Sequence, residues 1–247
     1  MVRFHEAGST QNKTVVLIHG WGCPWQIWEP YIEKLKNEYH VIVPSLHGYN
    51  GDDTQGKGIE YNASEIVEYL KEHCDRVHAV IGISYGANVL LKMLALQEIT
   101  ITHAIADACY LPEQSNEKEA RKMRGGIGVY KIAKPFKRML IKANAKSWGI
   151  ENSTKIINQI LSMPIKVLQD EIYAYFNFSL PEDTQSVKTN LQLWYGEKET
   201  DKRNNSEYVK KRFPCCSVIR IFPDCNHGDL VMARPDEYLQ EICKVIV

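Results

Sequence analysis

The stretch Gly82-Ile83-Ser84-Tyr85-Gly86 decides the fold that this chain is expected to adopt. It follows an apolar run at residues 77–81, typical of a strand, and precedes a run at residues 87–96 with the spacing of a helix. A sharp turn between strand and helix strains a central serine and lifts its hydroxyl above the sheet edge. Flanking glycines are needed because a β-carbon there would collide with the neighbouring strand or helix. The pattern predicts a nucleophile elbow centred on Ser84, with an ordinary turn of small residues as the alternative.

Short apolar runs rich in β-branched residues alternate with helical patterns along the chain. We predict strands at residues 14–18, 40–43, 77–81, 101–106, 191–195 and 218–222, and helices at residues 26–37, 64–74, 87–96, 206–213 and 236–247. This alternation is typical of a mostly parallel sheet with helices on both faces. Residues 111–185 break the rhythm with helical stretches punctuated by glycine and proline. We therefore predict one α/β domain, with a core at 1–110 and 186–247 and a helical lid inserted at 111–185.

The composition limits the partners and the compartment of the protein. The 247 residues are 44% hydrophobic, which suffices for one core, and 30 basic residues balance 30 acidic ones. No global field therefore favours nucleic acid or an anionic membrane. The seven cysteines show no metal-ligand spacing, and with no export signal they indicate free thiols in a reducing compartment. We expect a cytoplasmic protein with no metal, no nucleic-acid partner and no membrane span.

A serine hydroxyl needs a base within hydrogen-bond reach, and the base needs an acid to orient it. His227 follows the last predicted strand, and the ends of parallel strands open on one edge of the sheet. We predict His227 as the base, with a surface histidine as the alternative. The acid is expected in the loop after residues 191–195, where Glu199 is the first choice and Asp201 the second. Either acid could instead be a solvated loop charge.

Stabilisation of a tetrahedral oxyanion needs hydrogen-bond donors, and backbone amides suffice. The amide of Tyr85, at the start of the helix after the elbow, is one candidate. The second is Trp21, in the glycine-containing loop after the strand at residues 14–18. His19 could be mistaken for a catalytic base, but its place at a strand end favours a structural role through hydrogen bonds to that loop.

These motifs together resemble the α/β-hydrolase superfamily over nearly the whole chain. The resemblance rests on His19-Gly20-Trp21-Gly22, Trp28, Gly82-Ile83-Ser84-Tyr85-Gly86, Gly196 with Glu199, and His227-Gly228. The loop containing Trp21, followed closely by Trp28, is similar to the carboxylesterase branch that includes the pimeloyl-carrier-protein methyl esterases. This resemblance implies an eight-stranded sheet with a helical lid after the sixth strand. It also implies hydrolysis of an ester or thioester through an acyl-enzyme, without a cofactor.

Two positions depart from the family pattern. Many members have Asp-x-x-Gly-x-Gly after the second predicted strand, whereas this chain has Ser45-Leu46-His47-Gly48-Tyr49-Asn50-Gly51. The acid is usually aspartate, and Glu199 stands in its place. The first departure concerns loop geometry near the pocket. The second is chemically mild, because glutamate can orient an imidazole from a slightly different backbone position.

The predicted insertion concentrates positive charge. Residues 118–146 include one acid, Glu119, and ten basic residues: Lys118, Arg121, Lys122, Arg124, Lys131, Lys134, Lys137, Arg138, Lys142 and Lys146. This excess is explained either by a solvated helix surface or by attraction of an anionic or carrier-linked substrate. Four aromatic residues of the insertion could line an acyl pocket or belong to the core: Tyr173, Tyr175, Phe176 and Phe178.

The sequence therefore predicts a serine hydrolase acting on a small-molecule ester or thioester, with Ser84, His227 and Glu199 as catalytic residues. Trp21 and Tyr85 would hold the oxyanion. Two alternatives stay open, namely a ligand-binding protein without catalysis and a cofactor-free C–C hydrolase or lyase with the same three residues. Epoxide and haloalkane hydrolases are disfavoured, because they have aspartate where Ser84 lies.

Overall fold

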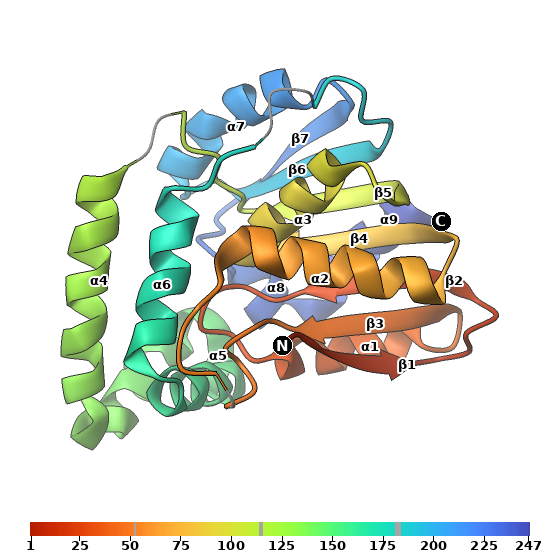
Figure 1. Cartoon of the computed structure of the whole chain (residues 1–247). Helices are drawn as coiled ribbons and strands as arrows, with labels where there is room; N and C mark the ends of the chain where they lie inside the picture. Colours follow the sequence, from red (N-terminus) through yellow and green to blue (C-terminus); the bar gives the residue numbers. More distant parts are fainter. Residues whose placement is uncertain (52, 114–115, 181–183) are drawn as a thin grey trace.

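A twisted sheet at the centre of the molecule positions every predicted site loop. The computed structural model describes residues 1–51, 53–113, 116–180 and 184–247. In these residues, the sheet has seven strands in the order β1-β3-β2-β4-β5-β6-β7 (Figure 1). They are β1 (Arg3–Ala7), β2 (Lys13–Ile18), β3 (Tyr39–Ser45), β4 (Arg76–Ile83), β5 (Thr100–Asp107), β6 (Asn190–Gly196) and β7 (Cys216–Phe222). All neighbouring strands are parallel except β1, which pairs antiparallel with β3.

The six predicted strands correspond to β2–β7, and β1 was not predicted. The strands β2, β3 and β4 are almost continuously buried, which explains their unbroken apolar runs. β1 reads RFHEA and lies at the sheet edge, where each of its side chains stays partly or fully exposed. The expectation of eight strands was wrong for the described part of the chain, which contains seven, and the insertion follows the fifth of them. Edge pairing of such a polar segment leaves no apolar run to detect.

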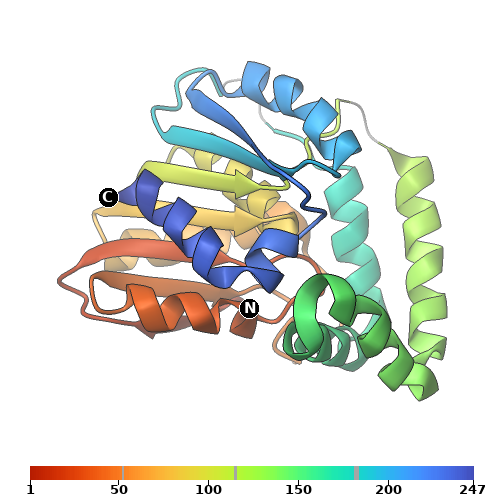
Figure 2. The same cartoon turned by 180° about the vertical axis from the view of Figure 1, so that it is seen from behind.

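Helices cover both faces of the sheet. α2 (Gly58–His73) and α3 (Tyr85–Leu96) lie on one face, and α1 (Glu29–Leu35) and α9 (Pro235–Ile246) lie on the other (Figures 1 and 2). The short 3-10 helix η1 (Trp25–Trp28) contacts α1, and α8 (Asp229–Ala233) contacts α9. α7 (Thr200–Arg212) connects β6 to β7. Nearly every residue of α3 is buried, so the elbow before it is anchored in the core.

The insertion, defined here as residues 111–185, forms a second group of helices. These are α4 (Glu117–Ile132), the 3-10 helix η2 (Lys134–Phe136), α5 (Lys137–Ser162) and α6 (Ile165–Phe176). α4 lies along α6, and the group stands beyond the carboxyl ends of the strands (Figures 1 and 2). α5 is interrupted at Gly149, whose φ of 73° lies in the left-handed region. Among the described residues, no helix is both long and apolar enough to cross a bilayer.

Both ends of the insertion are fastened to α7. The side chain of Asn205 binds the backbone of Leu111 twice, accepting from its N–H at 2.8 Å and donating to its carbonyl at 2.8 Å. At the other end, the Thr184 hydroxyl donates to the carbonyl of Arg212. The insertion therefore leaves and rejoins the core at a single helix.

Candidate active site

The turn between β4 and α3 has the geometry of a nucleophile elbow. Ser84 precedes α3 with φ 54° and ψ −117°, a conformation that a residue with a side chain rarely adopts. The backbone is held in place because Ser84 N–H donates to the carbonyl of Asp107 at 2.7 Å and the Ser84 carbonyl accepts from Ala87 at 2.9 Å. Local strain is thus maintained by hydrogen bonds from β5 and from the first turn of α3.

The glycines on either side of Ser84 leave no room for a side chain. A β-carbon at Gly82 would lie 2.4 Å from the carbonyl oxygen of Gly86. A β-carbon at Gly86 would lie 2.5 Å from the carbonyl oxygens of Ile18 and His19. The structure therefore shows the steric conflict that was expected for a side chain at either glycine.

His227 and Glu199, from two different loops, form a hydrogen bond. His227 Nδ1 lies 2.7 Å from Glu199 Oε1. Glu199 Oε2 accepts from the N–H of Gly196 at 2.8 Å, and only 4% of the Glu199 side chain is exposed. A carboxylate bound to Nδ1–H holds an imidazole in the tautomer whose Nε2 can accept a proton. Asp201, the second candidate acid, is exposed on the first turn of α7.

The two predicted oxyanion donors lie in the elbow itself and in the loop after β2. Tyr85 is the first residue of α3, where backbone N–H groups have no partner within the helix. Trp21 follows β2, and its indole Nε1–H donates to the carbonyl of Leu168 on α6 at 3.2 Å. The next amide along, Gly22 N–H, donates to the Tyr49 hydroxyl at 2.9 Å. The Trp21 loop is therefore tied both to the insertion and to the loop after β3.

His19 has the structural role that its position predicts. Its Nδ1 donates to the carbonyl of Gly20 at 3.0 Å, and its Nε2 accepts from the N–H of Leu46 at 3.2 Å. Complete burial lowers the pKa of His19 to about 4, so the neutral ring that these two bonds require persists at neutral pH. His19 thus joins the loop after β2 to the loop after β3.

One cavity of about 320 Å³ brings these residues together. It is lined almost wholly by apolar atoms and includes Trp21, Ser84, Tyr85 and His227. The insertion contributes Met123, Trp148, Ile156, Ile160, Ile172, Tyr175 and Phe176. Of the four aromatic candidates, Tyr175 and Phe176 thus line the cavity. Tyr173 instead binds Glu117 on α4 at 3.1 Å, and Phe178 packs in the core.

Comparison with known proteins places this arrangement in a family. The model of the alpha/beta hydrolase family matches residues 15–241. The chain belongs to the alpha/beta hydrolase family. The match begins in β2 and ends in α9, so it includes the elbow, both loops of the His227–Glu199 pair and the whole insertion.

Curated relatives of this alpha/beta hydrolase include esterases of one kind. A pimeloyl-(acyl-carrier protein) methyl ester esterase from Aeromonas hydrophila is 25% identical over 159 residues, which are 61% of this chain and 60% of that protein. Its counterpart from Aliivibrio salmonicida is 44% identical over 76 residues, which are 31% of this chain and 28% of that protein. The chain thus matches at most 60% of the length of these two relatives.

Solved structures resemble this alpha/beta hydrolase over almost its full length. An alpha/beta hydrolase family protein from Desulfitobacterium hafniense superimposes with a TM-score of 0.80, covering 98% of this chain and 99% of that one. The two chains are 21% identical, so this likeness concerns the fold.

Sequence reasoning missed three kinds of residue around the site of this hydrolase. The apolar residues that α4 and α5 contribute to the cavity look like ordinary core residues of an amphipathic helix. Asp107 closes β5 with a buried side chain, and its carbonyl accepts from Ser84. Glu171 is completely buried on α6. A signal existed for Glu171, because an acid shares the helical face of Leu168, Ile172 and Tyr175.

No group of three or more His, Cys, Asp or Glu side chains within the described ranges could hold a metal ion. None of the seven cysteines, all of which lie in described segments, forms a disulfide. Cys23 lines the cavity close to the elbow, but complete burial raises its pKa to about 12. The thiol of Cys23 is therefore protonated at neutral pH and is no competitor of Ser84 as a nucleophile.

Proposed function

We propose that this protein is a serine hydrolase that cleaves a carboxylic ester or thioester through an acyl-enzyme on Ser84. The observation that carries the proposal is the 2.7 Å contact between His227 Nδ1 and Glu199 at the wall of the cavity that also contains Ser84. A serine in a strained elbow, an imidazole and a buried carboxylate are the three groups that acyl transfer requires. The esterase relatives agree with this assignment.

The reaction proceeds in two halves. His227 Nε2 takes the proton of Ser84 as Oγ attacks the acyl carbon, and Glu199 keeps the other ring nitrogen protonated. The amides of Trp21 and Tyr85 bind the oxyanion of the tetrahedral intermediate. The intermediate collapses, and the alcohol or thiol leaves with the proton from His227. Water, deprotonated by His227, then attacks the acyl-enzyme and releases the carboxylic acid, which regenerates Ser84.

The cavity indicates an acyl group without charge in its buried part. Its walls are almost wholly apolar, so a charged group placed there would lose its hydration without a partner. Tyr175 and Phe176 add aromatic surface against which an acyl chain can pack. We expect hydrolysis of neutral p-nitrophenyl esters to pass through an optimum of chain length.

We also propose that the insertion attracts an anionic or carrier-linked substrate. Of the ten basic side chains at residues 118–146, eight are exposed; Arg124 is half-buried, and the Lys131 side chain lies outside the described part of the structure. Two of the eight are paired with acids, in the Arg121–Glu117 contact at 2.6 Å and the Lys122–Glu119 contact at 3.4 Å. Two of the other exposed charges, Lys137 and Arg138, lie in the chain between Phe136 and Met139, which are large exposed apolar side chains. A negatively charged carrier would complement this surface.

Two experiments test these proposals. Treatment with a fluorophosphonate followed by mass spectrometry should give stoichiometric labelling of Ser84, while Ser84→Ala stays unlabelled and Ser206→Ala, a buried serine on α7, labels normally. Absence of labelling in the wild type would favour a ligand-binding protein. Labelling without turnover of any ester in a p-nitrophenyl series would favour the related C–C hydrolase or lyase chemistry. Retention in a reducing compartment, which we propose to be the cytoplasm, is tested separately by fractionation.

For the charged surface, the double change Lys137→Glu with Arg138→Glu should raise KM for a carrier-linked ester roughly tenfold. KM for a neutral p-nitrophenyl ester should not change. Lys13→Glu, at the start of β2, is the matched control for a charge reversal elsewhere. If the carrier-linked ester is hydrolysed equally at low and high salt, the charges are an ordinary solvated surface.

A further inference from the structure

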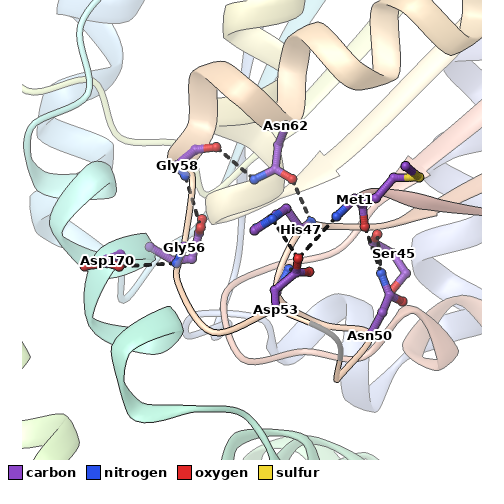
Figure 3. Close-up of polar contacts among 11 residues, drawn as sticks. Met1, Ser45, His47, Asn50, Asp53, Gly56, Gly58, Asn62 and Asp170 are labelled. Atoms are coloured by element: carbon purple, nitrogen blue, oxygen red, sulfur yellow. Dashed lines mark hydrogen bonds and ion pairs between the residues drawn. The ribbon is translucent and has the colours of Figure 1, made fainter.

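α6 of the insertion places one buried carboxylate against the side chain of Tyr85, a proposed oxyanion donor. Glu171 has no exposed surface. Its Oε1 accepts from the N–H of Gly58 at 3.1 Å, and its Oε2 accepts from the Tyr85 hydroxyl. Figure 3 shows the adjoining contact, in which Asp170 of α6 accepts from the N–H of Gly56 at 3.2 Å beside the start of α2. A single carboxylate therefore joins α6, α2 and α3.

The backbone around Glu171 is shaped to accept this carboxylate. A β-carbon at Gly56 would lie 2.6 Å from Glu171 Oε1 and 2.8 Å from the β-carbon of Asp170. Gly48, with φ 87°, leaves space for Val167 of α6, because a β-carbon there would lie 2.3 Å from Val167 Cγ1. The loop between β3 and α2, which departs from the usual family pattern, thus closes directly on α6.

Both proposed oxyanion loops have a tyrosine hydroxyl attached close to this carboxylate. Tyr85 itself binds Glu171, and the Tyr49 hydroxyl accepts from Gly22, the neighbour of Trp21. Burial first, and then the charge of Glu171, raise the pKa of Tyr85 and of Tyr49 well above the ordinary range. Both phenols therefore stay protonated, so the Tyr85 hydroxyl can donate to Glu171.

We propose that Glu171 is a positioning residue that couples the seating of α6 to the placement of the oxyanion donors, acting through Tyr85. The inference rests on the proposed function of Ser84 and its neighbours. The side chain and the amide of Tyr85 belong to one residue at the start of α3. Fixing the hydroxyl therefore restrains the position of the amide. α6 also presents Ile172, Tyr175 and Phe176 to the cavity. An acyl group that packs against α6 therefore acts on the helix that holds Tyr85.

The test compares Glu171→Gln, Tyr85→Phe, the double variant and Asp170→Asn. Asp170 is the matched control, since it lies next to Glu171 and binds the same loop at Gly56. With p-nitrophenyl butyrate we expect kcat to fall about 10- to 100-fold in both single variants while KM changes less than about twofold, because donor placement acts in the transition state. The double variant should be no slower than the slower single variant, and Asp170→Asn should keep kcat within about twofold.

Wild-type kcat in Glu171→Gln, or a change confined to KM, would overturn the inference, as would multiplicative losses in the double variant. If Glu171→Gln does not fold, the kcat and KM of Tyr85→Phe still test the inference. The ¹⁵N–¹H resonance of the Tyr85 amide provides a readout without turnover. If the wild type neither labels with fluorophosphonate nor hydrolyses esters, the proposed function fails. In that case, a shift of the Tyr85 amide resonance in Glu171→Gln would still support the coupling between α6 and the Tyr85 amide. An unchanged resonance would refute that coupling.

Discussion

The helices of the core and those of the insertion differ in how far they are buried. In the core, α3 is buried on nearly every side, and the groups proposed for catalysis lie on short loops at the carboxyl ends of β4, β6 and β7. In the insertion, α4, η2 and the first half of α5 are largely exposed, and they include Ile132, Phe136 and Met139 on the surface. Rigid packing therefore holds the reacting groups, while the pocket wall is built from helices with fewer constraints. The proposed reacting groups and most of the cavity wall thus belong to different parts of the chain.

The largest expected effect lies entirely in the core. Ser84→Ala and His227→Ala should each reduce kcat on the order of 10⁴- to 10⁶-fold, because each removes a member of one proton-transfer unit. Their combination should cost little more than either alone. Steady-state and single-turnover kinetics with the best p-nitrophenyl ester give the measurement. Losses that multiply in the double variant would show that the two residues do not act together.

A second comparison within the core separates the two candidate acids. Glu199→Gln should reduce kcat about 10³- to 10⁴-fold, because an amide no longer fixes the tautomer of His227 or stabilises the imidazolium. Asp201→Asn, two positions along and exposed, should leave kcat within about twofold. The same kinetic assay on both variants shows which acid orients His227. Equal losses would point to general damage of the loop after β6 rather than to one orienting carboxylate.

One buried ionisable group from each region should affect stability with opposite pH dependence. The pKa of His19 in the core is lowered to about 4, so its contribution to stability is lost as pH falls below 6.5. Burial raises the pKa of Glu171 in the insertion from 4.5 to about 7, so stability is lost as pH rises through that interval. Glu171→Gln removes the second effect only.

Relative to wild type, the free energy of unfolding of Glu171→Gln should therefore increase between pH 4.5 and 7, by up to about 3 kcal/mol. Urea unfolding curves at pH 5 and pH 7.5 measure the difference. Parallel pH profiles of the two proteins would mean that Glu171 titrates as an ordinary exposed acid.

The smallest expected effect concerns the insertion alone. Ile156→Phe adds volume to the wall of the cavity and should lower kcat/KM for long acyl chains about tenfold relative to acetyl esters. Ile150→Phe, at an exposed position of α5, is the control and should leave the chain-length profile unchanged. A uniform loss for all esters would show that α5 supports the reacting groups and does not only shape the pocket.

The same contrast explains what the sequence could predict. Strands such as β4 are covered on both faces and therefore appear as continuous apolar runs, and the elbow has steric requirements that only glycine meets. β1 was missed because its partly exposed edge position leaves no apolar pattern. α2 begins at Gly58, ahead of the predicted residue 64. The N–H of Gly58 donates to Glu171, a residue far along the chain, and this bond stabilises the early start of the helix. No local pattern records such a contact.

Chain order indicated which loops of the candidate site would lie together. Glu199 and His227 follow consecutive strands, so their loops were expected on one edge, and the structure joins them by a hydrogen bond. The walls of the cavity could not be assigned in this way. Trp148 and Met123 have the same apolar character whether they face a core or a ligand, and only tertiary packing distinguishes the two.

The attachment of both insertion ends to α7 has a consequence for divergence within such enzymes. Asn205 holds the outgoing chain at Leu111, and the carbonyl of Arg212 holds the returning chain at Thr184. A replacement segment of any length that begins and ends at these two points leaves the spacing of β5 and β6 untouched. One recombination event could therefore exchange most of the cavity wall as a cassette, while the core loops that hold Ser84, Glu199 and His227 are inherited intact.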